Sequence, residues 1–402
     1  MDFDFGARGR PGASGTEGYK SRRVSSYQTS LLASPRISVV GPKGGGFRCG
    51  AVAVICLLFP TVGAAASGAS QPSLYEGVRT ATLLGNSQAI AVSADGNLAY
   101  VGSGTDVAVV DLNTGQTVKR IPLHQTPQGF ALSRNGTQLY VVADLEHNDG
   151  GGVTYSDGGS VVRVDLATSS VASRVNFPFS LTTAIAAATH RVYVANGGSI
   201  IGINISTFKV AEKISVPDGP NHLATSANGS ALYGETGISS GAGIQNGSYF
   251  YAVNTVSRRV TTTVRGHFAP SSLTVIAPDR VAVSYDGSGV AAGNPSLQLL
   301  NGVGKVTASF QGTGSAGGAA IPASANVAYV DVTTGEIAVV DLRNLKEIAT
   351  IRLGSEGFLG PGPIAISENG RKICLIDDSV GSEETMQIVS LNPATIPIPA
   401  TT

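Results

Sequence analysis

A short motif that repeats along the chain constrains the fold more than any other feature of the sequence. Each copy contains two short apolar segments, and in the clear copies Asp-Gly or Asn-Gly separates them. This dipeptide between alternating apolar runs strongly favours a β-hairpin, because both residues tolerate a positive φ. Clear copies occupy residues 89–101, 129–141, 222–233 and 364–374, and weaker copies end at Tyr193, Ala282 and Tyr329. Repetition of this kind is the signature of a repeat architecture.

A second motif follows each copy of the first and also has the pattern of strand, turn and strand. The clearest copy runs from Val107 to Ile121. Related segments occupy residues 161–175, 200–214, 250–264, 297–310 and 337–351, with a truncated copy at 387–392. In five copies an Asp or Asn stands before the turn: Asp111, Asp165, Asn204, Asn254 and Asp341. Because Asx side chains bond to turn backbone, we interpret these five residues as turn formers.

The two motifs together predict four strands per unit and seven units at a spacing of about 40–50 residues, the range of propeller blades. We therefore predict an all-β fold, a seven-bladed β-propeller of four-stranded antiparallel blades. The last unit lacks its fourth strand, and residues 77–84, ahead of the first unit, have the pattern of that strand. We expect the N- and C-terminal strands to pair in the seventh blade, so that ring closure leaves no exposed sheet edge.

Three segments of the repeats resemble a known family. They read AYVG at 99–102, VAVVDLNTG at 107–115 and RVYVANG at 191–197, and they are similar to the YVTN-type β-propeller repeats of bacterial exported and surface proteins. Those repeats belong to the lactonase-like and quinoprotein-dehydrogenase-like group of seven-bladed propellers, and the resemblance covers residues 77–392. It implies the fold and an exported or surface protein. It implies no site, because the repeated residues build strands and turns.

The segment ahead of the repeats is organised like a secretory signal peptide. Lys43 and Arg48 precede an uncharged stretch that ends in the small residues of 64–69. We interpret residues 49–69 as the signal peptide; an uncleaved anchor is the alternative, since the stretch is near the lower limit of about 17–25 residues for a spanning helix. Residues 1–48 would then be a disordered extension or the result of a start codon assigned too early.

The mature protein is accordingly expected to comprise the propeller, residues 70–392, and a disordered tail at 393–402. We expect it to be secreted or held at the cell surface, with no membrane segment after cleavage. Cys49 and Cys56 would leave with the signal, so that Cys374 has no partner for an internal disulfide. Cys374 lies in an apolar strand, where a buried thiol is unreactive.

Charge and motifs narrow the classes of function. The chain of 402 residues carries 27 Lys and Arg against 27 Asp and Glu. This balance argues against a nucleic-acid partner, because phosphate binding requires a surplus of basic residues. The sequence contains no covalent haem motif, no HExxH zinc motif, no P-loop and no nucleophile elbow.

One face of the predicted propeller gathers the candidate functional residues. The loops from second to third strands and the loops between blades share this face, which we call the loop face. Long loops of the first kind are predicted at 143–159, 234–247, 285–295 and 377–385. Four histidines fall in or beside loops of this face, namely His124, His147, His222 and His267, whereas His190 lies on the opposite face. His222, His267 and His124 are the candidate catalytic residues, as ligands or general bases.

The loop at 143–159 is rich in glycine and in oxygen ligands, and we regard it as a candidate binding loop. Its polar residues are Asp144, Glu146, His147, Asp149 and Asp157. Carboxylates and carbonyls in a Gly-rich loop suit a hard divalent cation such as Ca²⁺ or Mg²⁺, with Asp144 and Asp149 as candidate ligands. The spacing is not that of an EF-hand, and the alternative is a solvated loop without a metal.

The sequence is compatible with two functions and favours the first. The first is an exported, non-enzymatic and monomeric propeller that binds a protein or cell-envelope ligand through its loop face without a cofactor. The second is a metal-assisted lactonase or lyase with its site at the mouth of the central channel. The first rests on repeats made of structural residues. The second rests on the acidic loop and on the histidines that share its face.

Overall fold

The computed structural model describes residues 74–392 except for 84–86, 149–153, 179–180, 182, 217–218, 227, 237–247, 267–269, 286–294, 313–315, 323–325, 333–334, 354–362 and 378–383. The proposed extension, signal peptide and C-terminal tail therefore lie outside the described residues. Within the described ranges the chain forms strands β1 to β28 and no α-helix. In that part of the chain no helix is long and apolar enough to cross a membrane.

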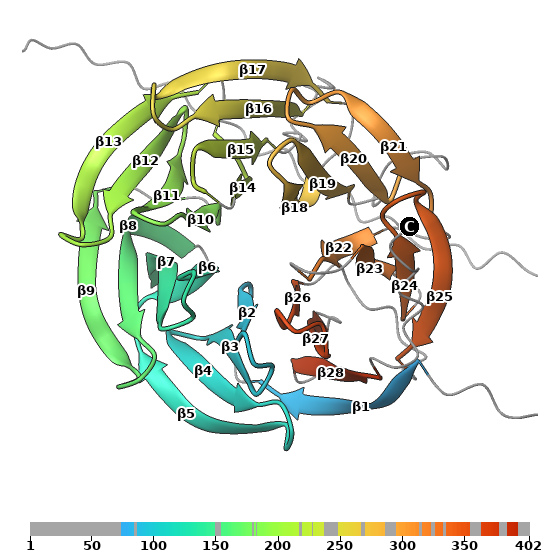
Figure 1. Cartoon of the computed structure of the whole chain (residues 1–402). Coiled ribbons are helices and arrows are strands. Elements are labelled where there is room, and N and C mark those ends of the chain that lie inside the picture. Colours follow the sequence, from blue (N-terminus) through green and yellow to red (C-terminus); the bar gives the residue numbers. More distant parts are fainter. Residues whose placement is uncertain are drawn as a thin grey trace, which may run out of the picture. The chain divides into compact units, whose positions relative to one another are not determined.

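The strands form seven four-stranded antiparallel sheets, which stand as blades around a central axis (Figure 1). From the inside outwards, blade 1 contains β2 (Ile90–Val92), β3 (Leu98–Ser103), β4 (Asp106–Asp111) and β5 (Gln116–Pro122). Blade 2 contains β6 (Thr126–Leu132), β7 (Gln138–Asn148), β8 (Thr154–Asp165) and β9 (Ser170–Phe177). Blade 3 contains β10 (Ile185–Ala187), β11 (Arg191–Asn196), β12 (Ser199–Asn204) and β13 (Lys209–Ser215).

The remaining blades repeat this order. Blade 4 contains β14 (His222–Thr225), β15 (Ala231–Glu235), β16 (Tyr249–Asn254) and β17 (Arg259–Arg265). Blade 5 contains β18 (Pro270–Ala277), β19 (Arg280–Tyr285), β20 (Leu297–Asn301) and β21 (Val306–Phe310). Blade 6 contains β22 (Ala316–Ala320), β23 (Val327–Val332), β24 (Glu336–Asp341) and β25 (Lys346–Arg352). Blade 7 contains β26 (Ile364–Ile366), β27 (Lys372–Asp377), β28 (Thr385–Leu391) and, outermost, β1 (Tyr75–Thr82).

The seventh blade confirms the predicted closure of the ring. Strand β1 pairs antiparallel with β28, in a register that runs from Val78 opposite Val389 to Thr82 opposite Thr385. On the face that carries the blade-to-blade loops, both carboxylate oxygens of Glu384 accept hydrogen bonds from Ser87, from its amide at 2.6 Å and its hydroxyl at 2.9 Å. The first and last parts of the propeller are therefore tied by a strand ladder and by side chains.

Hydrogen bonds explain why the first motif repeats. The Ser93 hydroxyl donates to Asp95 Oδ1 at 2.6 Å and accepts from the amide of Leu98 at 2.9 Å, which fixes both ends of the turn. Gly96, within that turn, has a φ of 73° that a side chain would disfavour. The hydroxyls of Ser133, Ser226 and Ser367 make the same two bonds in blades 2, 4 and 7.

The second motif is explained by Asx turns, as predicted. Asp111 Oδ1 accepts from the amides of Asn113 and Thr114 at 2.8 and 3.0 Å. Asp165, Asn204, Asn254 and Asp341 accept from turn amides in the corresponding places. These five residues are therefore turn formers in the structure.

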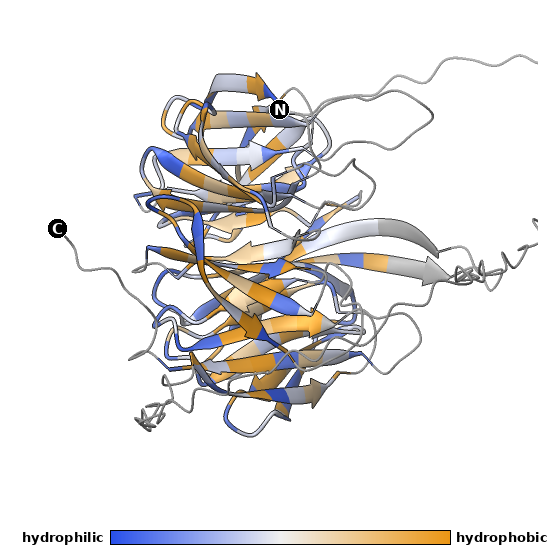
Figure 2. Cartoon of the chain, turned by 90° about the vertical axis from the view of Figure 1, so that its right-hand side faces the viewer, coloured by the Kyte–Doolittle hydropathy of each residue, from blue (hydrophilic) through white to orange (hydrophobic). Residues whose placement is uncertain are grey.

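The core is divided among the contacts between neighbouring blades. Seven clusters of buried apolar residues lie at these contacts, one at each. At the contact between blades 2 and 3, for example, Tyr140 is 1% exposed and stacks on Phe208. Figure 2 shows the apolar residues concentrated along the strands. Each blade therefore depends on both neighbours to bury its two faces.

The structure corrects the prediction that residues 143–159 form a loop. Strands β7 and β8 continue through most of it, with Glu146 paired to Ser156 and Asn148 paired to Thr154. Asp144, Glu146, His147 and Asp157 therefore lie in strands, and Asp149 lies outside the described residues. The physical reason is that a continued ladder pairs the backbone N–H and C=O groups that a loop would leave to solvent.

Ring closure leads to a matched pair of substitutions on β1. Ala81 is 1% exposed and packs with Cys374 and Met386, whereas the neighbouring Thr82 is exposed. We expect Ala81→Asp to lower the free energy of unfolding by about 3 kcal/mol or more, because it buries an unpaired charge. Thr82→Asp should change it by about 0.5 kcal/mol or less. Urea denaturation measures both, and equal stability of the two variants would contradict a structural role for this strand.

Candidate functional site at the mouth of the central channel

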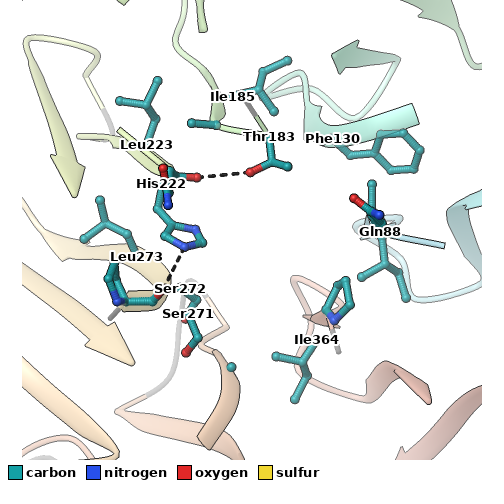
Figure 3. Close-up of a pocket in the computed structure, with 18 of the residues that line it drawn as sticks. Gln88, Phe130, Thr183, Ile185, His222, Leu223, Ser271, Ser272, Leu273 and Ile364 are labelled. Carbon is teal, nitrogen blue, oxygen red and sulfur yellow. Dashed lines mark hydrogen bonds between the residues drawn. The ribbon is translucent and has the colours of Figure 1, made fainter. Parts of the chain in front are cut away.

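A cavity of about 530 Å³ lies on the propeller axis, where the innermost strands of all seven blades begin. This end of the channel belongs to the loop face, because the chain enters each innermost strand from the loop that joins it to the preceding blade. Figure 3 shows side chains from several blades pointing towards the same space. The cavity is therefore built from equivalent positions of the repeat.

Two rings of side chains line the cavity. The outer one, which we call the polar ring, consists of Gln88, Gln128, Thr183, Asn221 and Ser271 from blades 1 to 5, with Gly317 in the equivalent place in blade 6. Two residues further along each chain lies the apolar ring: Ile90, Phe130, Ile185, Leu223, Leu273, Ala319 and Ile364. The strand registers align these positions, since Ile90 pairs with Val101 and Phe130 with Val141.

The described lining of the cavity presents hydrogen-bonding groups without formal charge. Amides and hydroxyls form its rim, and apolar side chains form the deeper ring. Blade 6 contributes only Gly317, Gly318 and Ala319, so that the wall is lowest there. Such a surface can bind a neutral polar group or the backbone of an extended segment, with an apolar part directed into the channel.

Among the described residues, His222 is the one titratable side chain that lines this cavity. Its Nε2 lies 3.2 Å from the carbonyl oxygen of Pro270, and because a carbonyl only accepts, Nε2 carries the proton. Burial lowers the pKa of His222 below its usual value, so that the imidazole is neutral at pH 7. Equivalent positions in the other blades hold smaller residues or proline, for example Ala89, Ser272 and Pro363. The imidazole therefore fills space that other blades leave open.

A buried acid lies directly behind His222. Glu235 is its cross-strand partner on β15, is 1% exposed, and bonds to the Tyr285 hydroxyl of the next blade. Its Oε2 has no hydrogen-bond partner among the described residues. Burial raises the pKa of Glu235 well above the ordinary value and so favours its neutral form. Burial also raises the pKa of Tyr285.

Serine hydroxyls continue the polar layer into blades 5 and 6. The hydroxyl of Ser284 lies 2.8 Å from that of Ser271 and 2.6 Å from that of Ser272. Ser272 also accepts a hydrogen bond from the amide of Ala319 at 3.2 Å. Ser284 and Asp331 occupy the position of Glu235 in these two blades, and both are buried. Buried polar groups therefore lie behind the channel mouth in blades 4, 5 and 6.

The predicted site residues are not all gathered at this cavity. His222 lines it, whereas His124 is exposed in the connection between blades 1 and 2, with a φ of 58°, and does not line it. His267 lies outside the described residues. His190 lies in the hairpin turn of the opposite face, as predicted. Cys374 is fully buried, and burial raises the pKa of its thiol to about 12, which agrees with the prediction of an unreactive cysteine.

The structure describes one of the two candidate metal ligands, Asp144. Asp144 is half-buried, and its Oδ1 lies 3.4 Å from the amide of Leu181, near the start of the next blade. The side chains of Glu146, His147, Asp149 and Asp157 lie outside the described residues. Among the residues whose side chains are described, no three His, Cys, Asp or Glu form a group that could hold a metal ion. The cation at this hairpin stays a prediction.

Sequence reasoning missed Glu235 and its serine neighbours. A signal was present: aligning the second strands places Glu235 and Asp331 where other blades have Gly102, Val142 and Ala195. An acid at a position that is otherwise small or apolar marks a departure from the repeat. Only the structure shows that this position faces the next blade and is fully buried.

The buried acid predicts a pH dependence. Because the folded-state pKa of Glu235 is raised, the folded protein binds a proton that the unfolded chain releases, and this contribution to stability is lost as pH rises above the unfolded value of about 4.3. Glu235→Gln should remove the loss and retain an acceptor for Tyr285. We expect the variant's stability relative to wild type to grow by up to about 1.4 kcal/mol per pH unit, measured by urea denaturation from pH 4.5 to 8. Parallel curves would contradict a neutral Glu235.

Comparisons with known proteins agree with this architecture. No family model and no curated protein matches the sequence. Among solved structures, the chain is similar to the hydrazine synthase of Kuenenia stuttgartiensis, with a TM-score of 0.59 and 18% identity over 80% of this chain and 99% of that one. It is also similar to the WD40 repeats of RRP9, with a TM-score of 0.60 and 12% identity over 78% and 97% of the two chains. The protein has the fold of these structures, a seven-bladed β-propeller.

Proposed function

We propose that this protein is an exported, non-catalytic binding propeller that holds a protein or cell-envelope partner at the channel mouth of its loop face. The observation that carries the proposal is how the repeats differ. The turn residues recur from blade to blade, whereas the polar ring changes from Gln88 to Thr183 to Ser271 at one structural position. Variation at a shared position, on a scaffold kept constant, is how a repeat protein forms a specific surface.

The chemistry of the mouth supports binding of an uncharged segment. Amide and hydroxyl side chains can bond to the backbone of a partner, and the apolar ring can receive one of its side chains. Propellers are often protein-binding scaffolds, and one of the similar structures is a set of WD40 repeats. Export is supported by the predicted signal peptide at 49–69 and by the resemblance to YVTN-type repeats of surface proteins.

Site-specific cross-linking tests the location of the partner. A photo-reactive amino acid placed at Gln128, in the polar ring, should form a cross-link to one partner when the full chain is expressed in its native cell envelope. The same group at Asn113, an exposed turn residue of the opposite face, is the matched control and should not. Mass spectrometry of the products identifies the partner. Equal cross-linking from both positions would contradict a binding site at the channel mouth.

Substitution of His222 separates this proposal from the metal-assisted lactonase or lyase. A binding propeller should keep its partner affinity within about threefold in His222→Ala, because the imidazole already bonds to Pro270. If the purified chain instead turns over a lactone in the presence of a divalent cation, and this variant abolishes turnover without lowering the melting temperature, the enzyme is the correct function.

A further inference from the structure

A second cavity, of about 350 Å³, lies on the face opposite the channel mouth, between blades 3 and 4. Turns build it: the β10–β11 hairpin with His190, the β14–β15 hairpin with Ser230, and the β16–β17 turn with Arg258. Val256, in the last of these turns, is 82% exposed at its border. No residue of this cavity belongs to the site described above.

One buried carboxylate organises the cavity. The Glu212 side chain is 2% exposed, and its two oxygens are shared between two arginines. Oε1 accepts a hydrogen bond from Arg191 Nε at 2.9 Å, and Oε2 forms an ion pair with Arg258, whose Nε lies 2.8 Å away. Burial and this carboxylate together raise the pKa of the adjacent Tyr193 to about 12, so that its hydroxyl stays neutral.

Among the described residues, the terminal nitrogens of the two guanidinium groups have no hydrogen-bond partner. Each contacts Glu212 through Nε, and no hydrogen bond joins the terminal nitrogens of Arg191 or Arg258 to the described residues. One carboxylate opposes two permanent cations, which leaves an excess positive charge in a concave surface. Hydroxyl and amide groups of Asn228, Ser230 and Thr255 line the same cavity.

The sequence that surrounds Glu212 departs from the repeat. At the bulge of the outer strands, blades 1, 4 and 6 have Val109, Ala252 and Val339, whereas blade 3 has Gly202. A Cβ at Gly202 would lie 2.6 Å from Glu212 Cγ, so that glycine is required for the buried carboxylate. The repeat is thus altered where Glu212 needs room.

Arg258 lies at a turn position that takes a left-handed backbone in several blades. Its φ is 58°, and the equivalent residues Ser169, Phe208 and Leu345 have φ values of 50°, 50° and 51°. This backbone therefore belongs to the repeated turn, and what is particular to blade 4 is the arginine side chain, whose Nε lies 2.8 Å from Glu212 Oε2.

We propose that this cavity is a binding site for an oxyanion, the carboxylate or phosphate group of a small ligand, held by Arg191 and Arg258. Glu212 is the positioning residue, because it fixes both Nε groups and leaves the terminal nitrogens to make charge-assisted hydrogen bonds to the ligand. The hydroxyls of Ser230 and Thr255 already donate to Asn228 Oδ1 and to the Gly229 carbonyl, so that the two arginines supply the donors to the ligand. This site is independent of partner binding at the channel mouth.

Titration calorimetry on the purified full chain tests the proposal, with inorganic phosphate and acetate as probes in low-salt buffer. We expect the better of the two to bind with a Kd of about 1 mM or tighter, and the stronger probe distinguishes a phosphate group from a carboxylate. Arg258→Gly should weaken binding about tenfold, the loss of one charge-assisted contact. Glycine adopts this φ without strain, so that the variant is expected to fold.

Arg259→Gln is the matched control. Arg259 is exposed at the start of β17, next in sequence, and does not line the cavity. The control removes the same charge and should change the affinity less than about twofold. The proposal would be overturned if neither probe binds wild type, or if both variants weaken binding equally, since the effect would then reflect net charge alone. Melting temperatures of both variants confirm that each is folded.

Discussion

Every blade of this protein has two apolar faces, and the whole structure depends on each face being covered by a neighbouring blade. A row of blades would leave two faces uncovered, and closure of the ring covers them and pairs β28 with β1. The strand β1 that completes blade 7 is therefore part of the core. It places Ala81 against Cys374 and Met386, residues near the other end of the chain.

Closure also determines what the two faces can do. Because all innermost strands start at one end of the axis, single residues from seven blades meet there in rings, and small differences between repeats become a specific surface. The polar groups behind the mouth follow from the same geometry. Glu235 is covered by blade 5, and its burial favours the neutral form, in which it adds hydrogen-bonding groups to the channel wall without adding charge.

The opposite face is made of short turns, and between blades 3 and 4 it departs from the repeat. A glycine at position 202 makes room for Glu212, and Glu212 orients arginines from two blades. A buried charge of this kind persists only when it is paired. Here two arginines pair with one carboxylate, and the excess positive charge that remains is the physical basis for the proposed anion site.

The sequence by itself determined the fold, the number of blades, the closure by the N-terminal strand and the turn role of Asp111 and its counterparts, because local hairpin chemistry and repetition are written along the chain. The tertiary structure alone decided which residues face one another. It extended β7 and β8 through the expected loop and left His124 away from the cavity. It also brought Glu235 to Tyr285 and Glu212 to Arg258. Such pairs join different blades, and contacts between blades depend on the register and direction of strands that no local pattern encodes.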